Sequence, residues 1–321
     1  MNAFLSPEVL SLLILETVLL LFLSLSFVIA LKISRRFDIR ATTGEQYRLE
    51  RQSYLVSVII SFALMIKGGV FVYFVFTLDK LSNVITGAMC AAGVVTATEY
   101  GVYLLIVKLL NLFLFGFWLV LNRLDNRHET YPYTRIKFGY FAALFPLIIT
   151  EYLLFLFHMG ALDPAAIVSC CGVLFSAGNS SIIGDLVAIP DRYTLALLFF
   201  LFGTVLLAAY RKSYPLLFSG TLLFIPVAVI AVINIFSTYI YELPTHRCPF
   251  CLLQKEYTYT GYLGYLLLFG GTFLLLAQSL GKLCFHEESG YLKTGTWLLS
   301  FFMLWACYYP LHYYLTNGVF L

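Results

Sequence analysis

The sequence predicts an all-α fold: a polytopic transmembrane helix bundle of about eight spans. Two observations support this fold class. Hydrophobic residues make up 61% of the 321 residues and charged residues only 12%, whereas soluble domains are about half apolar and a quarter charged. Apolar runs of about 20 residues, long enough to cross a hydrocarbon core roughly 30 Å thick, also recur along the whole chain. We therefore expect residues 1–321 to form a single integral membrane domain.

Eight apolar segments are long enough to be spans, with polar segments between them. The first is too long for the apolar region of a signal peptide, so we expect it to be a permanent span. The seventh could begin as early as Cys251. The eight predicted spans cover residues 10–33, 54–78, 102–121, 138–157, 193–210, 215–237, 259–280 and 297–315.

The distribution of lysine and arginine predicts the orientation of the spans, because cytoplasmic loops carry an excess of these residues. With the basic loop 32–51 placed in the cytoplasm, 14 of the 20 lysines and arginines fall on the inner side, and Lys67 and Lys108 fall inside spans. Those on the outer side are Lys80, Arg192, Arg247 and Lys255. We therefore expect extracytoplasmic N- and C-termini and a multi-pass protein of the bacterial inner membrane.

Most of the cysteines fall on the predicted outer side, which is an oxidising compartment. Of the seven in the chain, the five outer ones are Cys90, Cys170, Cys171, Cys248 and Cys251. Cys284 is predicted to be cytoplasmic. Cys307 lies inside the last span, where a buried thiol usually behaves as a small apolar side chain. The five outer cysteines are therefore the candidates for a function.

The most chemically specific stretch is residues 246–255, which contains a Cys-x-x-Cys pair, Cys248 and Cys251. We expect this pair at the start of the seventh span, where the partial positive charge of a helix N-terminus stabilises a thiolate. Arg247 and Lys255 add to that charge. A lowered thiol pKa also makes a cysteine a better leaving group, which suits thiol–disulfide exchange.

The residues from Cys248 to Lys255, Cys-Pro-Phe-Cys-Leu-Leu-Gln-Lys, resemble DsbB-type disulfide-generating membrane proteins and the related vitamin K epoxide reductase-type proteins. The resemblance implies that Cys248 and Cys251 are the redox pair beside a membrane quinone. It also implies that Lys255 stands near the quinone, where the family usually has arginine. The family has about four spans and a second cysteine pair, whose role would fall here to Cys170, Cys171 or Cys90.

A second interpretation is that the outer residues bind or transport a soft metal such as copper or zinc, because thiolates, imidazoles and thioethers are suitable ligands. The candidate ligands are Cys170, Cys171, His246, Cys248 and Cys251, with Met89, Met159 and His158 as further donors. A c-type haem is not expected, since Leu252 rather than histidine follows Cys251. A b-type haem held by His158 and His312 is a further alternative.

A third interpretation is a non-catalytic membrane subunit whose outer loops are stapled by static disulfides. Two features argue against it. The Cys-x-x-Cys loop is so short that a disulfide across it gains little stability from loop closure. Five outer cysteines also cannot all be joined in disulfides with one another.

Three ionisable residues are predicted inside the membrane. Lys67 and Glu151 each lie thirteen residues from the cytoplasmic start of their span, and Lys108 lies six residues from the outer start of its own. At 1.5 Å per residue all three reach a similar depth in the outer half of the bilayer. Such residues are expected to pair, to face a cavity or to serve a pathway. They would form either a structural ion pair or a polar pocket that binds a quinone headgroup or relays protons.

The function favoured by these observations is thiol–disulfide redox chemistry on the extracytoplasmic face. The Cys248–Cys251 pair would exchange electrons with a membrane quinone, and a periplasmic thioredoxin-like protein would be the thiol partner. Membrane lipid is the other expected partner. A nucleic-acid partner is not expected, because the net charge of +3 is small and spread over many loops.

Overall fold

The computed structural model describes residues 4, 6–38, 41–163, 165, 168 and 189–321. Every regular element in these ranges is a helix, which confirms the predicted all-α class. Within them, seven helices are long and apolar enough to cross a membrane, so the chain is a multi-pass membrane protein. The helices divide into two compact units. The prediction of a single domain stays a prediction, and each unit is described by itself.

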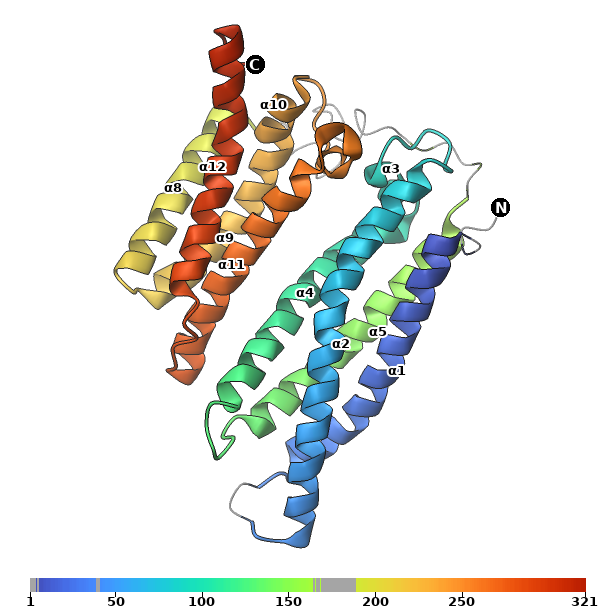
Figure 1. Cartoon of the computed structure of the whole chain (residues 1–321), viewed down its shortest axis with the longest axis vertical. Coiled ribbons are helices and arrows are strands. Elements are labelled where there is room, and N and C mark those ends of the chain that lie inside the picture. The colour runs from blue at the N-terminus through green and yellow to red at the C-terminus, as the bar shows by residue number, and fades with distance from the viewer. Residues whose placement is uncertain (1–3, 5, 39–40, 164, 166–167, 169–188) are drawn as a thin grey trace. The chain divides into compact units, whose positions relative to one another are not determined.

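Unit 1 comprises Met1–Thr86 and Val94–Ala166. Its long helices are α1 (Pro7–Arg36), α2 (Gly44–Ser82), α4 (Glu99–Asp125) and α5 (Thr134–Ala161). The short α3 (Ala91–Thr96) precedes α4, and only its second half belongs to unit 1. Helix α1 packs against α2 and α5, and α4 packs against the same two helices, so the four form a closed bundle (Figure 1). Side chains from all four helices therefore reach one interior.

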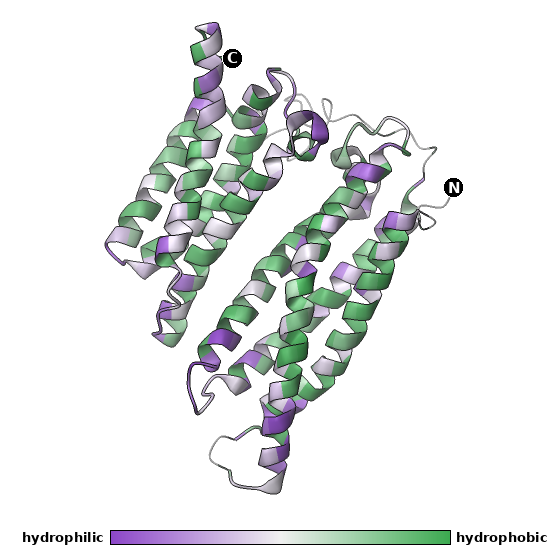
Figure 2. Ribbon diagram, in the orientation of Figure 1, coloured by the Kyte–Doolittle hydropathy of each residue, from purple (hydrophilic) through white to green (hydrophobic). Residues whose placement is uncertain are grey.

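The helix α2 begins ten residues before the predicted span. Thr43 caps it, because its hydroxyl accepts a hydrogen bond of 3.2 Å from the backbone N–H of Gln46. The charged residues that follow are good helix formers and continue the helix outside the apolar run. Most of the predicted cytoplasmic loop 32–51 is thus helical, and the loop proper is short. Figure 2 shows this hydrophilic start of α2 below its hydrophobic body.

Unit 2 comprises Gly87–Gly93 and Ile167–Leu321. Its elements are α8 (Asp191–Tyr210), α9 (Tyr214–Ala231), the π-helix η2 (Val232–Phe236), α10 (Ser237–Tyr241), α11 (Thr260–Phe285) and α12 (Leu292–Asn317). Helices α9, η2 and α10 form one continuous rod. The rod packs against α8, α11 and α12, so unit 2 is also a bundle of four rods (Figure 1).

The rod α12 covers the predicted eighth span but is not among the seven helices apolar enough to cross a membrane. Its second half contains Tyr308, Tyr309, His312, Tyr313 and Tyr314, which lower its hydropathy. The helix that was predicted is present. An eighth crossing, and with it the outer position of the C-terminus, stays a prediction.

The segment before α11 differs from the expectation that the seventh span could begin at Cys251. Two short 3₁₀ helices, η3 (Cys251–Leu253) and η4 (Lys255–Tyr257), come first. Thr258 and Tyr259 then adopt left-handed backbone conformations with φ of 53° and 55°, which interrupt the helical path before α11. The cysteine pair therefore does not lie at the N-terminus of α11, and stabilisation of a thiolate by that helix dipole does not apply.

Candidate functional site

Three of the predicted outer cysteines converge in unit 2. Cys90 comes from Gly87–Gly93, while Cys248 and Cys251 come from the loop between α10 and α11. The three sulfur atoms lie within 4.8 Å of one another and all three residues are buried. The Sγ atoms of Cys90 and Cys248 are 3.5 Å apart, which is contact distance rather than the roughly 2.05 Å of a disulfide. We call these three residues the cysteine triad.

Two tyrosines hold the backbone of the Cys-x-x-Cys loop. The hydroxyl of Tyr241, at the end of α10, donates to the carbonyl of Cys248. The hydroxyl of Tyr265, in α11, donates to the carbonyl of Pro249 at 2.7 Å. These bonds tie the loop to the helices on either side of it in sequence. They orient the two carbonyls and leave the sulfurs directed at each other and at Cys90.

The loop also packs closely on the start of α11. Leu252 is fully buried, and a Cβ built on Gly261 would lie 2.7 Å from the Cβ of Leu252. Only a glycine at this position allows such a close approach of loop and helix. The position of Cys251, next to Leu252, therefore depends on the absence of a side chain at Gly261.

We expect Gly261→Ala to destabilise unit 2 by about 1–3 kcal/mol, because overpacking forces the loop away from α11. The matched control is Gly203→Ala in α8, where a new Cβ meets nothing within 4 Å. Thermal unfolding in detergent would compare the two variants with the wild type. Equal stability of all three would contradict the close packing described above.

Gln254 links the loop to the segment that carries Cys90. Its side-chain amide donates a hydrogen bond of 3.1 Å to the carbonyl of Met89. Gln254 belongs to the stretch that resembles the DsbB-type proteins, and its observed contact holds Cys90 beside the pair. Lys255 is exposed and Arg247 is half-buried, so the charge of Lys255 is the more strongly hydrated of the two predicted cations.

Aromatic side chains surround the loop. Tyr241 packs edge-on against both His246 and Tyr257, with ring centroids 4.6 and 4.5 Å apart. Burial raises the pKa of the Tyr257 hydroxyl, and the neighbouring Cys251 acts in the same direction. Burial lowers the pKa of the His246 imidazole, although the nearby Cys90 acts in the opposite direction. His246 is therefore neutral at neutral pH, the form in which a histidine binds metals.

The lowered pKa of His246 predicts that stability falls in acid. Below its ordinary pKa of about 6.5, the unfolded chain binds a proton at this position more readily than the folded chain, so folding is opposed as pH decreases. We expect His246→Gln to lose less thermal stability than the wild type between about pH 7.5 and pH 5. His312→Gln, at an exposed position on α12, is the control and should behave as the wild type. An identical acid response in His246→Gln would contradict the prediction.

The triad geometry is compatible with two kinds of chemistry. A sulfur 3.5 Å from another is close enough for thiol–disulfide exchange after a small movement. Three sulfurs bound to one zinc ion at 2.3 Å lie about 3.8 Å apart, so the same triad also suits a soft metal. No family model, no curated protein and no solved structure matches this chain.

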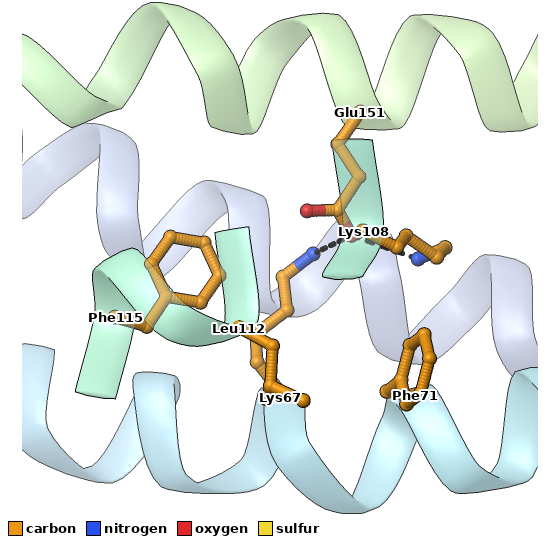
Figure 3. A pocket seen from close by; sticks show the side chains of 6 residues that line it. All are labelled: Lys67, Phe71, Lys108, Leu112, Phe115 and Glu151. Atoms are coloured by element: carbon orange, nitrogen blue, oxygen red, sulfur yellow. Dashed lines mark hydrogen bonds and ion pairs between the residues drawn. The ribbon is translucent and has the colours of Figure 1, made fainter. Parts of the chain in front are cut away.

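The predicted intramembrane residues Lys67, Lys108 and Glu151 come together in the interior of unit 1, as their similar depth suggested. Figure 3 shows both ammonium groups directed at the Glu151 carboxylate. The Nζ atoms of Lys67 and Lys108 lie 2.9 and 2.7 Å from its Oε1 atom. A fourth residue, Glu16 of α1, was not predicted. Its Oε1 accepts a bond of 2.6 Å from Lys108, and its Oε2 accepts one from Lys67.

These four side chains alternate in charge and form a closed ring, which we call the ionic ring. One residue comes from each of the four long helices of unit 1, and each is almost completely buried. A cavity of about 10 Å³ adjoins the ring and is lined by Lys67, Phe71, Lys108, Leu112, Phe115 and Glu151 (Figure 3). This is about the space that a single water molecule needs. A quinone headgroup at these residues stays a prediction, and it would require the helices to separate.

The remaining predicted residues fall elsewhere in the chain or outside the part that the structure describes. Cys170 and Cys171 lie outside the described residues, so their part in any relay or metal site stays a prediction. His158 is buried in α5 of unit 1, where its Nδ1 lies 2.6 Å from the Thr98 hydroxyl. Met159 is also buried in α5, whereas His312 is exposed on α12. The metal ligand set predicted from sequence also omitted Cys90, which lies in the triad.

Proposed function

We propose that this protein is a membrane thiol–disulfide oxidoreductase that passes electrons between an extracytoplasmic thiol protein and a membrane quinone. The observation that carries the proposal is the approach of Cys90, from a distant part of the sequence, to the Cys248–Cys251 pair. A static staple needs two sulfurs, whereas exchange needs a third within reach of one of them. Three buried sulfurs within 4.8 Å meet that requirement.

The proposed reaction conserves electrons and protons. A thiol of the partner attacks the Cys248–Cys251 disulfide and forms a mixed disulfide. The second thiol of the partner then attacks the mixed disulfide. The partner leaves with its two cysteines joined in a disulfide, and Cys248 and Cys251 are both thiols. These two thiols return to a disulfide by giving two electrons and two protons to the quinone, which becomes a quinol. In a reversible exchange, the Cys90 thiol would attack Cys248 in the Cys248–Cys251 disulfide. The Cys248–Cys251 bond breaks, Cys251 leaves as a thiol, and a Cys90–Cys248 disulfide forms as an intermediate.

The bundle of unit 2 supports the proposal as well. The families that the Cys-x-x-Cys stretch resembles have about four spans, and unit 2 alone has four rods with the pair before its third. In this proposal both termini and the triad are extracytoplasmic, the eighth helix also crosses, and the membrane is a bacterial inner membrane. The positive-inside distribution of lysine and arginine supports that orientation.

Differential alkylation followed by mass spectrometry tests the proposal. The purified, metal-free protein is reduced, its thiols are counted, and a soluble quinone analogue is added under anaerobic conditions. We expect two thiols of the triad to be lost for each quinone reduced, with Cys248–Cys251 or Cys90–Cys248 recovered as a disulfide. Triad thiols that remain fully alkylatable after quinone addition would overturn the proposal.

A second candidate function is soft-metal binding, which the convergence of three sulfurs favours on its own. In this case the triad supplies three thiolate ligands to Cu(I) or Zn(II), and the neutral imidazole of His246 lies near Cys90 as a possible fourth. We would load the reduced protein with each metal alone and measure the retained metal after desalting. About one ion per chain, lost in Cys90→Ser, would support this candidate; equal retention by Cys90→Ser would exclude the triad as the site.

A further inference from the structure

Cys90 lies in a tight turn of unit 2, residues Gly87–Gly93, which we call the Cys90 turn. Gly87 adopts a left-handed conformation with φ of 87°, which glycine takes without steric cost. The N–H of Gly93 donates to the carbonyl of Cys90 at 3.1 Å, and a Cβ built on Gly93 would lie 2.9 Å from the Cβ of Ala88. The turn is therefore compact, and its position decides whether the Cys90 sulfur reaches the Cys-x-x-Cys pair.

A hydrogen bond from the cysteine loop is made directly beside Cys90. The side chain of Cys90 is fully buried, whereas its neighbour Met89 is 68% exposed. The carbonyl of Met89 accepts the bond of 3.1 Å from the side-chain amide of Gln254. This carbonyl belongs to the peptide group that joins Met89 to Cys90. The bond therefore acts on the backbone that carries the third sulfur of the triad.

The other end of this bond is fixed within the cysteine loop. The backbone N–H of Gln254 donates to the carbonyl of Cys251 at 3.0 Å. The carbonyl of Gln254 accepts from the N–H groups of Tyr257 and Tyr259, at 3.3 and 3.1 Å. The backbone of Gln254 is thus held between Cys251 and the start of α11, and its side chain connects this fixed point to the Cys90 turn.

The two sulfurs of the Cys-x-x-Cys pair are positioned by other contacts. The hydroxyl of Tyr241 donates to the carbonyl of Cys248, and that of Tyr265 donates to the carbonyl of Pro249. Only two residues separate the paired cysteines, so they stay close wherever the Cys90 turn lies. Exchange with Cys90 is more demanding, because a misplacement of about 1 Å between reacting groups can slow a reaction about 10²-fold.

We propose that Gln254 is a positioning residue that sets how the triad divides between two disulfides, Cys248–Cys251 and Cys90–Cys248. This inference rests on the exchange step of the proposed function. The Cys90 thiol loses its proton and attacks Cys248, the Cys248–Cys251 bond breaks, and Cys251 leaves and takes up a proton. No electrons leave the triad, so the step needs no oxidant. The bond from Gln254 raises the effective concentration of Cys90 beside Cys248 and so favours the second disulfide.

Equilibration with glutathione tests the proposal without a quinone. The full chain, metal-free and in lipid nanodiscs, is incubated anaerobically with mixtures of reduced and oxidised glutathione, quenched with acid and alkylated. Mass spectrometry then gives the ratio of the Cys90–Cys248 disulfide to the Cys248–Cys251 disulfide. In Gln254→Met, which keeps a side chain of similar length but has no donor, we expect this ratio to fall about two- to tenfold, because one hydrogen bond is lost.

Further variants make the result specific to the hydrogen bond. Gln254→Glu, whose carboxylate cannot donate, should lower the ratio as well. Gln254→Lys restores a donor and should keep the ratio closer to that of the wild type than Gln254→Met does. Glu256→Gln alters an exposed neighbour in the same loop and should keep the wild-type ratio. A purely structural role of Gln254 would lower thermal stability and leave the ratio unchanged.

Two results would overturn the inference, and they differ in what they exclude. An unchanged ratio in folded Gln254→Met and Gln254→Glu proteins would exclude the role of Gln254 and leave the redox proposal intact. No Cys90–Cys248 disulfide in the wild type at any glutathione ratio would exclude the exchange step itself, whether or not the variants fold. Failure of the quinone to oxidise the triad is a separate result, because glutathione replaces the quinone in this measurement.

Discussion

Replacing Cys248 with serine is expected to reduce quinone-dependent oxidation of a thiol substrate by at least about 10³-fold, a loss typical for removal of an essential nucleophile. Cys248 belongs to the Cys-x-x-Cys pair and also lies 3.5 Å from Cys90. Both disulfides in the proposed cycle therefore include its sulfur. The measurement is the rate of quinol formation with a small dithiol as the electron donor.

The comparison with other cysteines makes this prediction specific. Cys90→Ser should leave the reaction of the pair with quinone intact and slow only the steps that pass through the Cys90–Cys248 disulfide. Cys284→Ser, at an exposed position near the end of α11, should keep wild-type turnover. If Cys248→Ser turns over as fast as Cys284→Ser, the triad is not the redox centre.

Breaking the ionic ring is expected to have the second-largest effect. Lys67→Met leaves Glu16 and Glu151 with one ammonium group between them, so an unbalanced negative charge stays buried. Removing one partner from a buried ion pair typically destabilises a protein by about 3–5 kcal/mol. We expect a loss of that size in the free energy of unfolding, measured by titration with sodium dodecyl sulfate in mixed micelles.

Charge balance should restore much of this stability. In Lys67→Met combined with Glu16→Gln, Lys108 and Glu151 remain as a neutral pair 2.7 Å apart, so we expect recovery of at least about half of the loss. The control is Arg36→Gln, which removes an exposed ion pair with Glu45 and should change stability by less than about 1 kcal/mol. A single Lys67→Met variant as stable as Arg36→Gln would show that an unbalanced charge in the ring costs no stability.

Much of the fold follows from the sequence because membrane spans need a long apolar run. All eight predicted segments are helices, and the depth calculation brought Lys67, Lys108 and Glu151 together correctly. The same calculation would have found Glu16, which lies six residues from the outer start of the first predicted span. A single charge in an apolar run was therefore the available signal.

The geometry around the cysteines was less predictable. Periodicity cannot reveal that Thr258 and Tyr259 take left-handed conformations, which separate the pair from α11. Nor does any local pattern show that Cys90 reaches Cys248 across 158 residues of sequence. Tyr241 and Tyr265 look like ordinary aromatic residues near span ends, and only their hydroxyl contacts distinguish them. Tertiary packing determines these features.

The π-helix η2 sets the rotational phase of the residues that follow it. The N–H of Ser237 bonds to the carbonyl of Val232, five residues back instead of four, so this turn holds one extra residue. One residue corresponds to about 100° of rotation around a helix axis. In an uninterrupted α-helix, Tyr241 would therefore face a different side of the rod, away from the carbonyl of Cys248. The extra residue in the π-helix thus rotates α10 so that Tyr241 faces the cysteine loop.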